Sequence, residues 1–168
     1  MLRLLEATDV MELTQAVRES VDSASPWLPW CHAEYGEQDA RNWIRNCQLN
    51  ARAHRAFEFG VFKKDGKQLI GGAGLSFIDW PNRCANLGYW VRQSLQGRGV
   101  ASTCVTALSQ FGFRKLALHR IEIVVAVGND ASAAVARKSG ALLECVARNR
   151  LFLHGAPVPA QVFSLVPE

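Results

Sequence analysis

One segment past the middle of the chain limits what the chain can fold into, because a strand leads through a glycine-rich turn into a helix. Leu87–Val91 has the pattern of a strand, Gly97–Gly99 forms the turn, and helical spacing of apolar residues follows to about Leu118. The first turn of a helix carries backbone N–H groups without partners, and its dipole attracts negative charge. Glycines let the backbone approach such a charge closely, because no Cβ intervenes. The segment therefore predicts an anion-binding site.

A glycine-rich turn of this kind has several interpretations. The simplest is a plain turn without a ligand. A dinucleotide-binding fold would place the turn after its first strand, with an acidic residue about 20 positions later at the end of the next strand. Here the turn lies past mid-chain, and Glu122 falls at the start of its strand. A nucleotide-binding phosphate loop would require Gly-Lys-Ser/Thr, which does not follow the turn.

The rest of the chain alternates between short strands and helices, with no repeat or low-complexity tract. Asp65-Gly66 is a strong signal for a two-residue hairpin turn, and Ser23–Pro29 interrupts a helical pattern with two prolines. Strands are expected at Leu2–Leu5, Ala56–Lys63, Gln68–Phe77, Ala85–Val91, Arg120–Val127, Ala141–Arg150 and Gln161–Val166, and helices at Thr8–Val21, Gln38–Arg55, Gly99–Leu118 and Asn129–Gly140. This order predicts one α/β domain over residues 1–168, with a mixed sheet and helices on its faces.

Composition is that of an ordinary globular protein, with 49% hydrophobic and 20% charged residues. No apolar run reaches the roughly 20 residues that a membrane span needs, and the N-terminus lacks a signal-peptide pattern, so we expect a cytoplasmic protein without a membrane partner. The net charge of +4 suits an anionic partner such as a nucleotide cofactor or ribosomal RNA. Lys and Arg are dispersed, so specific DNA binding is not expected. A homodimer is compatible with the sequence.

The five cysteines are odd in number and scattered along the chain, and no two form a C-x-x-C pair. This spacing suggests neither a zinc site nor a redox motif, and no metal site is expected. Buried free thiols in a reducing compartment are the simplest interpretation.

Several segments together resemble one family. Gln96–Ala101, read as Gln-x-x-Gly-x-Ala, resembles the element by which the GNAT superfamily of acyl-CoA N-acyltransferases holds the pyrophosphate of CoA. The preceding strand Leu87–Val91 and the segment Val127–Ala141 are similar to flanking segments of that superfamily. Trp27–Trp30 resembles the branch that acetylates the N-termini of ribosomal proteins. The resemblance implies a mostly antiparallel sheet of about six or seven strands, splayed apart at the CoA site.

The resemblance also implies the residues of an acetyl-CoA site. In that superfamily the pantetheine arm hydrogen-bonds the open edge of the splayed strand. The implied cofactor-binding residues are Tyr89, Trp90, Val91, Gln96, Gly97, Arg98, Gly99, Val100, Ala101, Ser102, Thr103, Asn129 and Ser132. Asn129 and Ser132 have a second interpretation as helix-capping residues.

Acetyl transfer by direct attack of an amine requires a neutral amine, a stabilised oxyanion and a stabilised leaving thiol. By analogy with the superfamily, a backbone N–H at Trp90 or Val91 is the candidate oxyanion donor, and Ser132 is the candidate donor to the thiol. Many relatives carry an acidic residue where this chain has Asn86, so no base is evident. The remaining candidate bases are His32, Glu34, His119 and Glu122.

For the acceptor, Trp30, Asn86 and Tyr89 are the candidate contacts, and Trp27 and Trp90 could extend an aromatic wall. Core packing is the competing interpretation of the tryptophans. Three functions stay open: an enzyme that acetylates a protein N-terminus, with the ribosome as a candidate partner; an enzyme of the same fold that acts on a small amine; and an acyl-CoA-binding module without activity.

Overall fold

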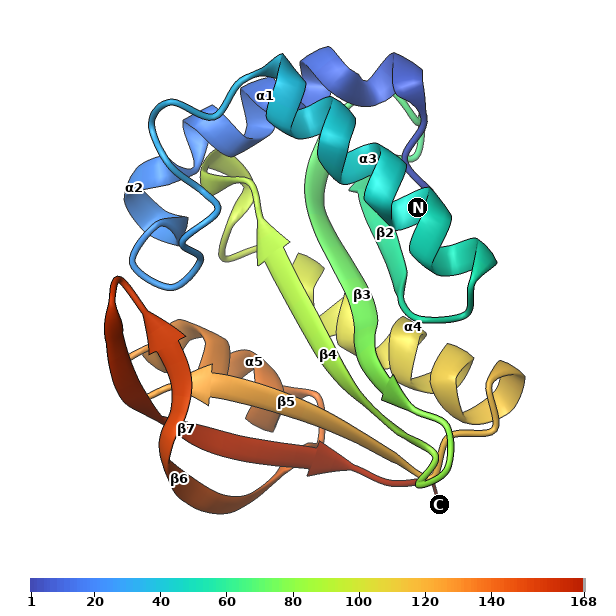
Figure 1. The fold of residues 1–168 in the computed structure, drawn as a ribbon, viewed down its shortest axis with the longest axis vertical. Helices are drawn as coiled ribbons and strands as arrows, with labels where there is room; N and C mark the ends of the chain where they lie inside the picture. Colours follow the sequence, from blue (N-terminus) through green and yellow to red (C-terminus); the bar gives the residue numbers. More distant parts are fainter. Residues whose placement is uncertain (168) are drawn as a thin grey trace.

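A computed structural model describes residues 1–167 (Figure 1). The elements are β1 (Leu2–Arg3), α1 (Val10–Glu19), α2 (Val21–Ala24), α3 (Glu37–Arg52), β2 (Phe57–Phe62), β3 (Leu69–Asp79), β4 (Cys84–Val91), α4 (Val100–Lys115), β5 (Arg120–Ala126), α5 (Asp130–Lys138), β6 (Leu142–Leu153) and β7 (Ala156–Leu165). Short 3₁₀ turns at Ala7–Asp9 and Gln93–Leu95 precede α1 and α4. Among the described residues, no helix is long and apolar enough to cross a membrane.

All seven strands belong to one sheet in the order β1-β2-β3-β4-β5-β7-β6. Every neighbouring pair is antiparallel except β4 and β5, which run parallel. Parallel neighbours need a crossover, and α4 supplies it. The predicted mixed, mostly antiparallel sheet with helices on both faces is confirmed.

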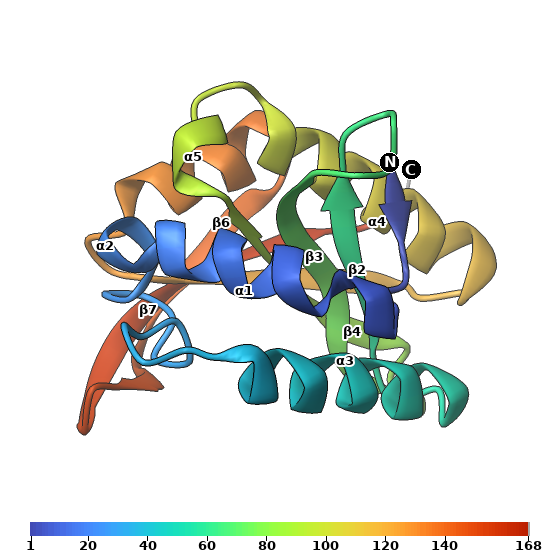
Figure 2. The same ribbon diagram turned by 90° about the horizontal axis from the view of Figure 1, so that it is seen from above.

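Two hydrophobic clusters lie on opposite faces of this sheet. α4 and α5 cover one face, and α1 and α3 cover the other (Figure 2). Leu75 of β3 and Leu87 of β4 point into the first cluster together with Leu108 of α4. Val17 of α1 packs in the second cluster, against which the Trp90 ring also lies. Side chains alternate along a strand, so residues 87 and 89 face α4, whereas residues 88 and 90 face α1 and α3.

The turn signals in the sequence place most boundaries correctly. Gly66 has φ of 71° in the β2–β3 turn, and Gly140, which follows the C-cap residue Ser139 of α5, has φ of 83°. The first helix differs from its prediction, because it ends at Glu19 rather than Val21. There the Ser20 hydroxyl donates to the Ala16 carbonyl at 2.7 Å, and a separate short helix, α2, follows and ends at Ala24, before the first proline, Pro26. β6 extends three residues beyond its predicted end at Arg150, to Leu153.

The cysteines are all free. Cys31, Cys47 and Cys104 are buried, as expected for structural thiols. Cys84 is partly buried, and Cys145 is exposed on β6, the last strand of the sheet. The expectation of buried thiols is therefore wrong for Cys145, because β6 is an edge strand on which every residue from Leu142 to Arg150 except the partly buried Ala147 is exposed.

Candidate active site

The β4 and β5 strands are paired over only part of their length. Cys84–Asn86 of β4 pair with Arg120–Glu122 of β5, after which β4 stays with β3 and β5 stays with β7. Figure 1 shows the two strands diverging from this end of the sheet. The stretch Leu87–Val91 therefore has an edge without a strand partner, which an extended ligand can join by backbone hydrogen bonds. The predicted splay is confirmed.

The direction of the backbone groups on β4 decides which amides face the splay. The Arg92 amide donates to the Ile70 carbonyl of the strand on the other side, at 3.0 Å. Successive amides of a strand alternate sides, so the Trp90 amide also faces β3, and those of Tyr89 and Val91 face the splay. The Trp90 amide is thus badly placed as an oxyanion donor. The amide of Val91, the alternative candidate, faces the splay, and so does the amide of Tyr89.

The glycine-rich turn leaves the start of α4 open. Gly97 has φ of 74° and Gly99, the N-cap residue, has φ of 77°, a left-handed conformation that side chains disfavour. No side chain caps the helix, and within residues 1–167 the amides from Gly97 to Ser102 have no acceptor. The hydroxyls of Ser102 and Thr103 each donate to the Gly99 carbonyl at 3.0 Å. The backbone at Val100 and Ala101 is thus presented to an anion.

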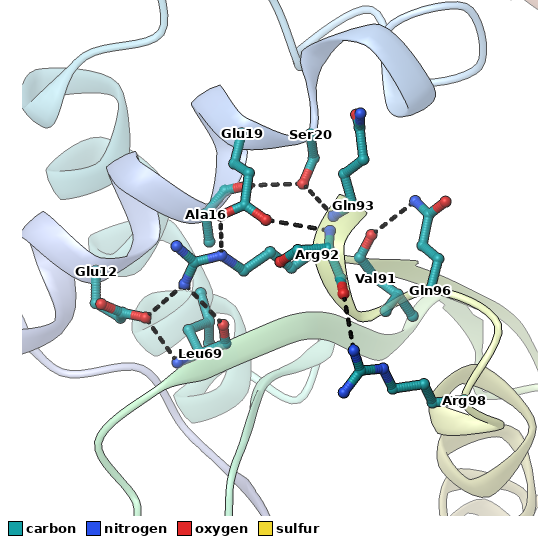
Figure 3. A network of polar contacts seen from close by, with 11 residues as sticks. Glu12, Ala16, Glu19, Ser20, Leu69, Val91, Arg92, Gln93, Gln96 and Arg98 are labelled. Carbon is teal, nitrogen blue, oxygen red and sulfur yellow. Dashed lines mark hydrogen bonds and ion pairs between the residues drawn. The ribbon is translucent and has the colours of Figure 1, made fainter.

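A buried arginine anchors this turn to the first helix, as Figure 3 shows. The Arg92 guanidinium forms ion pairs with Glu12 and Glu19 of α1, and the arginine is only 4% exposed. Glu12 also accepts from the Leu69 amide at the start of β3, at 3.0 Å. Sequence reasoning missed Arg92, because nothing local indicates that its partners lie more than 70 positions earlier.

The backbone beside Arg92 is held by the same helix. The Gln93 amide donates to the Ser20 hydroxyl, and the Ser94 amide donates to the Glu19 carboxylate, both at 3.1 Å. The Gln96 side chain donates to the Val91 carbonyl at 3.0 Å, so it closes the turn onto the end of β4 (Figure 3). The exposed Arg98 guanidinium donates to the Ser94 carbonyl at 3.4 Å.

Across the splay, the start of α5 faces the Tyr89 side chain. Asn129 is the N-cap residue, and its side-chain oxygen accepts from the Ser132 amide at 3.1 Å. The capping interpretation of Asn129 is therefore correct, and no residue in 1–167 accepts from its side-chain amide group. The Tyr89 hydroxyl lies 3.0 Å from both the carbonyl and the hydroxyl oxygen of Ser132. Tyr89 and Ser132 thus meet on the α4 and α5 face of the sheet.

On the opposite face, aromatic side chains surround a cavity of ≈ 160 Å³. The Trp30 ring packs edge-on against Trp90 at 5.8 Å and stacks on Trp43 of α3 at 6.4 Å. The lining residues are Leu5, Leu13, Leu28, Trp30, Trp43, Glu58, Phe59, Leu69, Gly71, Gly72, Ala73, Gly88, Tyr89 and Trp90. Of the three candidate acceptor contacts, Trp30 and Tyr89 line this cavity and Asn86 does not, and the acceptor roles of all three stay predictions. Trp27 lies elsewhere, with its ring near Gly128.

One carboxylate, Glu58 on β2, lines the cavity. Burial raises the pKa of Glu58 to about 7. Its side chain forms no hydrogen bond or ion pair with any residue in 1–167, so nothing compensates its loss of hydration. Sequence reasoning missed it, because an acidic residue in the alternating stretch 56–63 is typical of a solvated strand face. Only the neighbours of Glu58 across the sheet distinguish it from an exposed acidic residue.

The bases proposed from the sequence lie elsewhere. His32 and Glu34 are 3.4 Å apart on an exposed loop. Glu122 forms an ion pair with Arg120 at 2.9 Å, and exposed His119 directly precedes β5 at the paired end of the sheet. None of these four side chains lines the cavity.

Comparison with known proteins identifies the family. Residues 1–142 match the family described as Acetyltransferase (GNAT) domain. The chain belongs to this family. Its members are acetyltransferases that use acetyl-CoA, and this GNAT protein is an acyltransferase enzyme.

Similar proteins include several with names that concern ribosomal proteins. The GNAT chain is 31% identical to YdaF of Bacillus subtilis (strain 168), a candidate ribosomal N-acetyltransferase, over 98% of this chain and 90% of YdaF. It is 33% identical to the ribosomal-protein-serine acetyltransferase of Escherichia coli (strain K12), over 77% of this chain and 71% of that protein. The structure of RimL, a ribosomal α-N-protein acetyltransferase in complex with coenzyme A, has a TM-score of 0.89 and 25% identity, covering 98% of this chain and 92% of RimL.

Proposed function

We propose that this GNAT acetyltransferase transfers the acetyl group of acetyl-CoA to the N-terminal α-amine of a protein, with ribosomal proteins as the substrate class. The observation that supports the donor most strongly is the open edge of β4 between Leu87 and Val91, which leads directly into the uncapped start of α4. The names of the similar proteins support the acceptor.

The residues present fit acetyl-CoA. The amides from Gly97 to Ser102, which have no acceptor within residues 1–167, suit a diphosphate. The backbone of Tyr89 and Val91 can form hydrogen bonds with the pantetheine arm in the splay. The amide group of Asn129, at the start of α5 on the opposite side of the splay, can donate to the same arm. When bound, acetyl-CoA supplies the thioester carbon that the amine attacks.

Two groups of this chain stabilise charge in the reaction. The amides of Tyr89 and Val91 face the splay and can donate to an oxygen that becomes negative. The Ser132 hydroxyl, held by the Tyr89 hydroxyl at 3.0 Å, donates to the leaving sulfur. Burial raises the pKa of Tyr89, so its phenol stays protonated and can keep Ser132 oriented.

An α-amine suits this site better than a lysine side chain. With a pKa near 7.7–8.0, an α-amine needs only about 1 kcal/mol to become neutral at pH 7.4, whereas a lysine with a pKa near 10.4 needs about 4 kcal/mol. The cavity of ≈ 160 Å³ is also smaller than the roughly 300–1,000 Å³ of sites that enclose a whole small molecule. It therefore suits the end of a chain that continues outside.

The test is a panel of acceptors incubated with the enzyme and acetyl-CoA. The panel contains peptides that begin with the N-termini of ribosomal proteins, the same peptides with blocked N-termini and an internal lysine, and spermidine. Thiol release and mass spectrometry measure the product. We expect acetylation at the α-amine of the unblocked peptides. Turnover on spermidine alone would replace this function with small-amine acetylation, and absence of turnover with every acceptor would favour a binding module.

A further inference from the structure

The aromatic cavity contains an unpaired carboxylate whose partial burial lowers the stability of the fold. Glu58 lies on β2 among the rings of Trp30, Trp43 and Trp90, and no cation in residues 1–167 pairs with it. Elsewhere on the same face, Glu12 and Glu19 are paired with Arg92. A half-buried carboxylate without a partner is unfavourable for stability, so a role in function is the better explanation.

Glycines on two neighbouring strands make room for this carboxylate. Glu58 pairs with Gly74 of β3, and Gly74 pairs with Gly88 of β4, so the three residues form one row across the sheet. A Cβ on Gly74 would collide with the Glu58 carboxylate, which therefore lies flat over that strand. A Cβ on Gly88 would meet nothing within 4 Å. Because neighbouring strands are about 4.8 Å apart, the carboxylate lies about one strand spacing from open space above β4.

That open space adjoins the splay. Gly88 immediately precedes Tyr89, whose amide faces the unpaired edge of β4. An amine that reaches the thioester from the aromatic side would pass over Gly88, beside the Glu58 carboxylate. We propose that Glu58 is the general base that accepts a proton from the acceptor amine, and that the Trp30, Trp43 and Trp90 rings enclose the acceptor's first residue. This proposal rests on the proposed function and adds the base and the acceptor subsite to it.

The proton transfer balances simply. One proton leaves the acceptor's ammonium nitrogen for the Glu58 carboxylate and passes from there to solvent. The nitrogen lone pair forms the new N–C bond while the C=O electron pair moves to the oxygen, and the C–S bond breaks when the C=O bond re-forms. The second N–H proton ends on the sulfur, with Ser132 donating to that atom. No oxidant, metal or further reactant is needed.

The titration of Glu58 fits this task. Its raised pKa of about 7 is close to that of an α-amine, which favours proton exchange between the two groups near neutral pH. The titratable side chain beside it on α3 is the Cys47 thiol, and burial raises the pKa of that thiol to about 12, so it is neutral in that range. No charged side chain of α1, α3 or β3 contributes to the shift, whose cause is burial.

The deciding variant is Glu58→Gln, which keeps the size of the side chain and removes the base. We expect kcat with an N-terminal peptide to fall about 100-fold at pH 7, while affinity for CoA changes by less than about 2-fold. The acidic limb of the wild-type pH–rate profile, near pH 7, should disappear. Glu34→Gln, which removes an exposed carboxylate beside His32, is the matched control and should keep the wild-type rate.

A second measurement does not depend on turnover. In protein labelled with ¹³C at glutamate side chains, one carboxyl resonance should titrate near pH 7 and be missing from Glu58→Gln. Adding an unblocked peptide should shift this resonance, whereas the N-terminally acetylated peptide should not. If Glu58→Gln is poorly folded, Glu58→Asp retains the charge, and its kcat should fall by about 10-fold.

The outcomes separate this proposal from the proposed function. If wild-type enzyme acetylates the peptide and Glu58→Gln keeps both the rate and the acidic limb, Glu58 is not the base and the function stands. If wild-type enzyme acetylates only spermidine, the function is wrong, and the same variant tested with spermidine decides the role of Glu58. A resonance near pH 7 that no acceptor perturbs would contradict the proposed placement of the amine.

Discussion

The proposed donor and acceptor sides of the active site consist of different kinds of groups. The donor side consists mainly of backbone groups from one continuous stretch, residues 87–102, in which glycines and a strand edge expose amides, with Asn129 and Ser132 facing it from α5. The acceptor side consists of side chains from four separate regions, namely Trp30 in a loop, Trp43 on α3, Glu58 on β2 and Trp90 on β4. The donor side requires mainly a local backbone conformation, whereas the acceptor side requires the assembly of the whole sheet.

This difference predicts how each side fails when it is altered. A backbone site tolerates changes of nearby side chains but not of the glycines or of the contacts that hold the turn in place. A side-chain site depends on each group separately, and one substitution removes one function.

Gly99→Trp should break the donor side. Gly99 combines φ of 77° with a position at the start of α4, so a large side chain both strains the turn and covers the amides. Loss of two or more charge-assisted hydrogen bonds, each worth about 1.5–3 kcal/mol, should weaken CoA binding about 1000-fold. Calorimetric titration with CoA measures this. Gly155→Trp, at φ of 80° in the β6–β7 turn, carries the same backbone strain and should bind CoA normally.

Arg92→Met should show that the donor side depends on one distant anchor. Removing the arginine leaves Glu12 and Glu19 without their buried partner, which should cost about 3 kcal/mol of stability. Denaturant unfolding measures the loss, and CoA affinity should fall with it, because the turn after β4 loses its attachment to α1. Arg41→Met removes an exposed pair with Glu37 and should change stability by less than about 0.5 kcal/mol. Equal effects of the two variants would contradict the anchoring role.

The acceptor side should have a signature in the pH dependence of stability. The folded-state pKa of Glu58, about 7, lies above the ordinary value of 4.5, so folded protein binds more protons than unfolded protein between these values. Stability should therefore fall as pH rises from about 4.5 to about 7, by an amount on the order of 2 kcal/mol. The measurement is the difference in unfolding free energy between wild type and Glu58→Gln across this range. A constant difference would mean that Glu58 is not buried as described.

Ser132→Ala should have the smallest effect, because it removes one donor to the leaving sulfur and leaves the α5 cap intact. Asn129 accepts from the backbone amide of residue 132, which alanine retains. We expect kcat to fall about 10-fold, equivalent to about 1.4 kcal/mol, with CoA affinity unchanged. Steady-state kinetics with a fixed peptide measures this. An unaltered kcat would remove Ser132 from the reaction, and a weakened CoA affinity would place its role in binding.

Much of the donor side could be predicted from the sequence. Turn and cap signals such as Asp65-Gly66, Asn129 and Gly140 act over a few residues, so their positions in the structure match the prediction. Leu87–Val91 and the turn after it are likewise one local motif. The orientation of the Trp90 amide toward β3 could not be predicted, because it depends on which neighbour strand β4 pairs with at each position.

The order of most elements and the positions of the main turns and caps could be predicted from the sequence, since glycines, caps and hydrophobic periodicity act locally, while the family was indicated by the resemblance of several motifs together. Which side chains meet depends on the tertiary fold. Pairing of β2, β3 and β4 places Glu58, Gly74 and Gly88 in one row. On the same face, Trp43 of α3 stacks on Trp30. The physical reason is register: an acidic residue in one strand becomes a buried base only when the strands beside it contribute glycines at the same level.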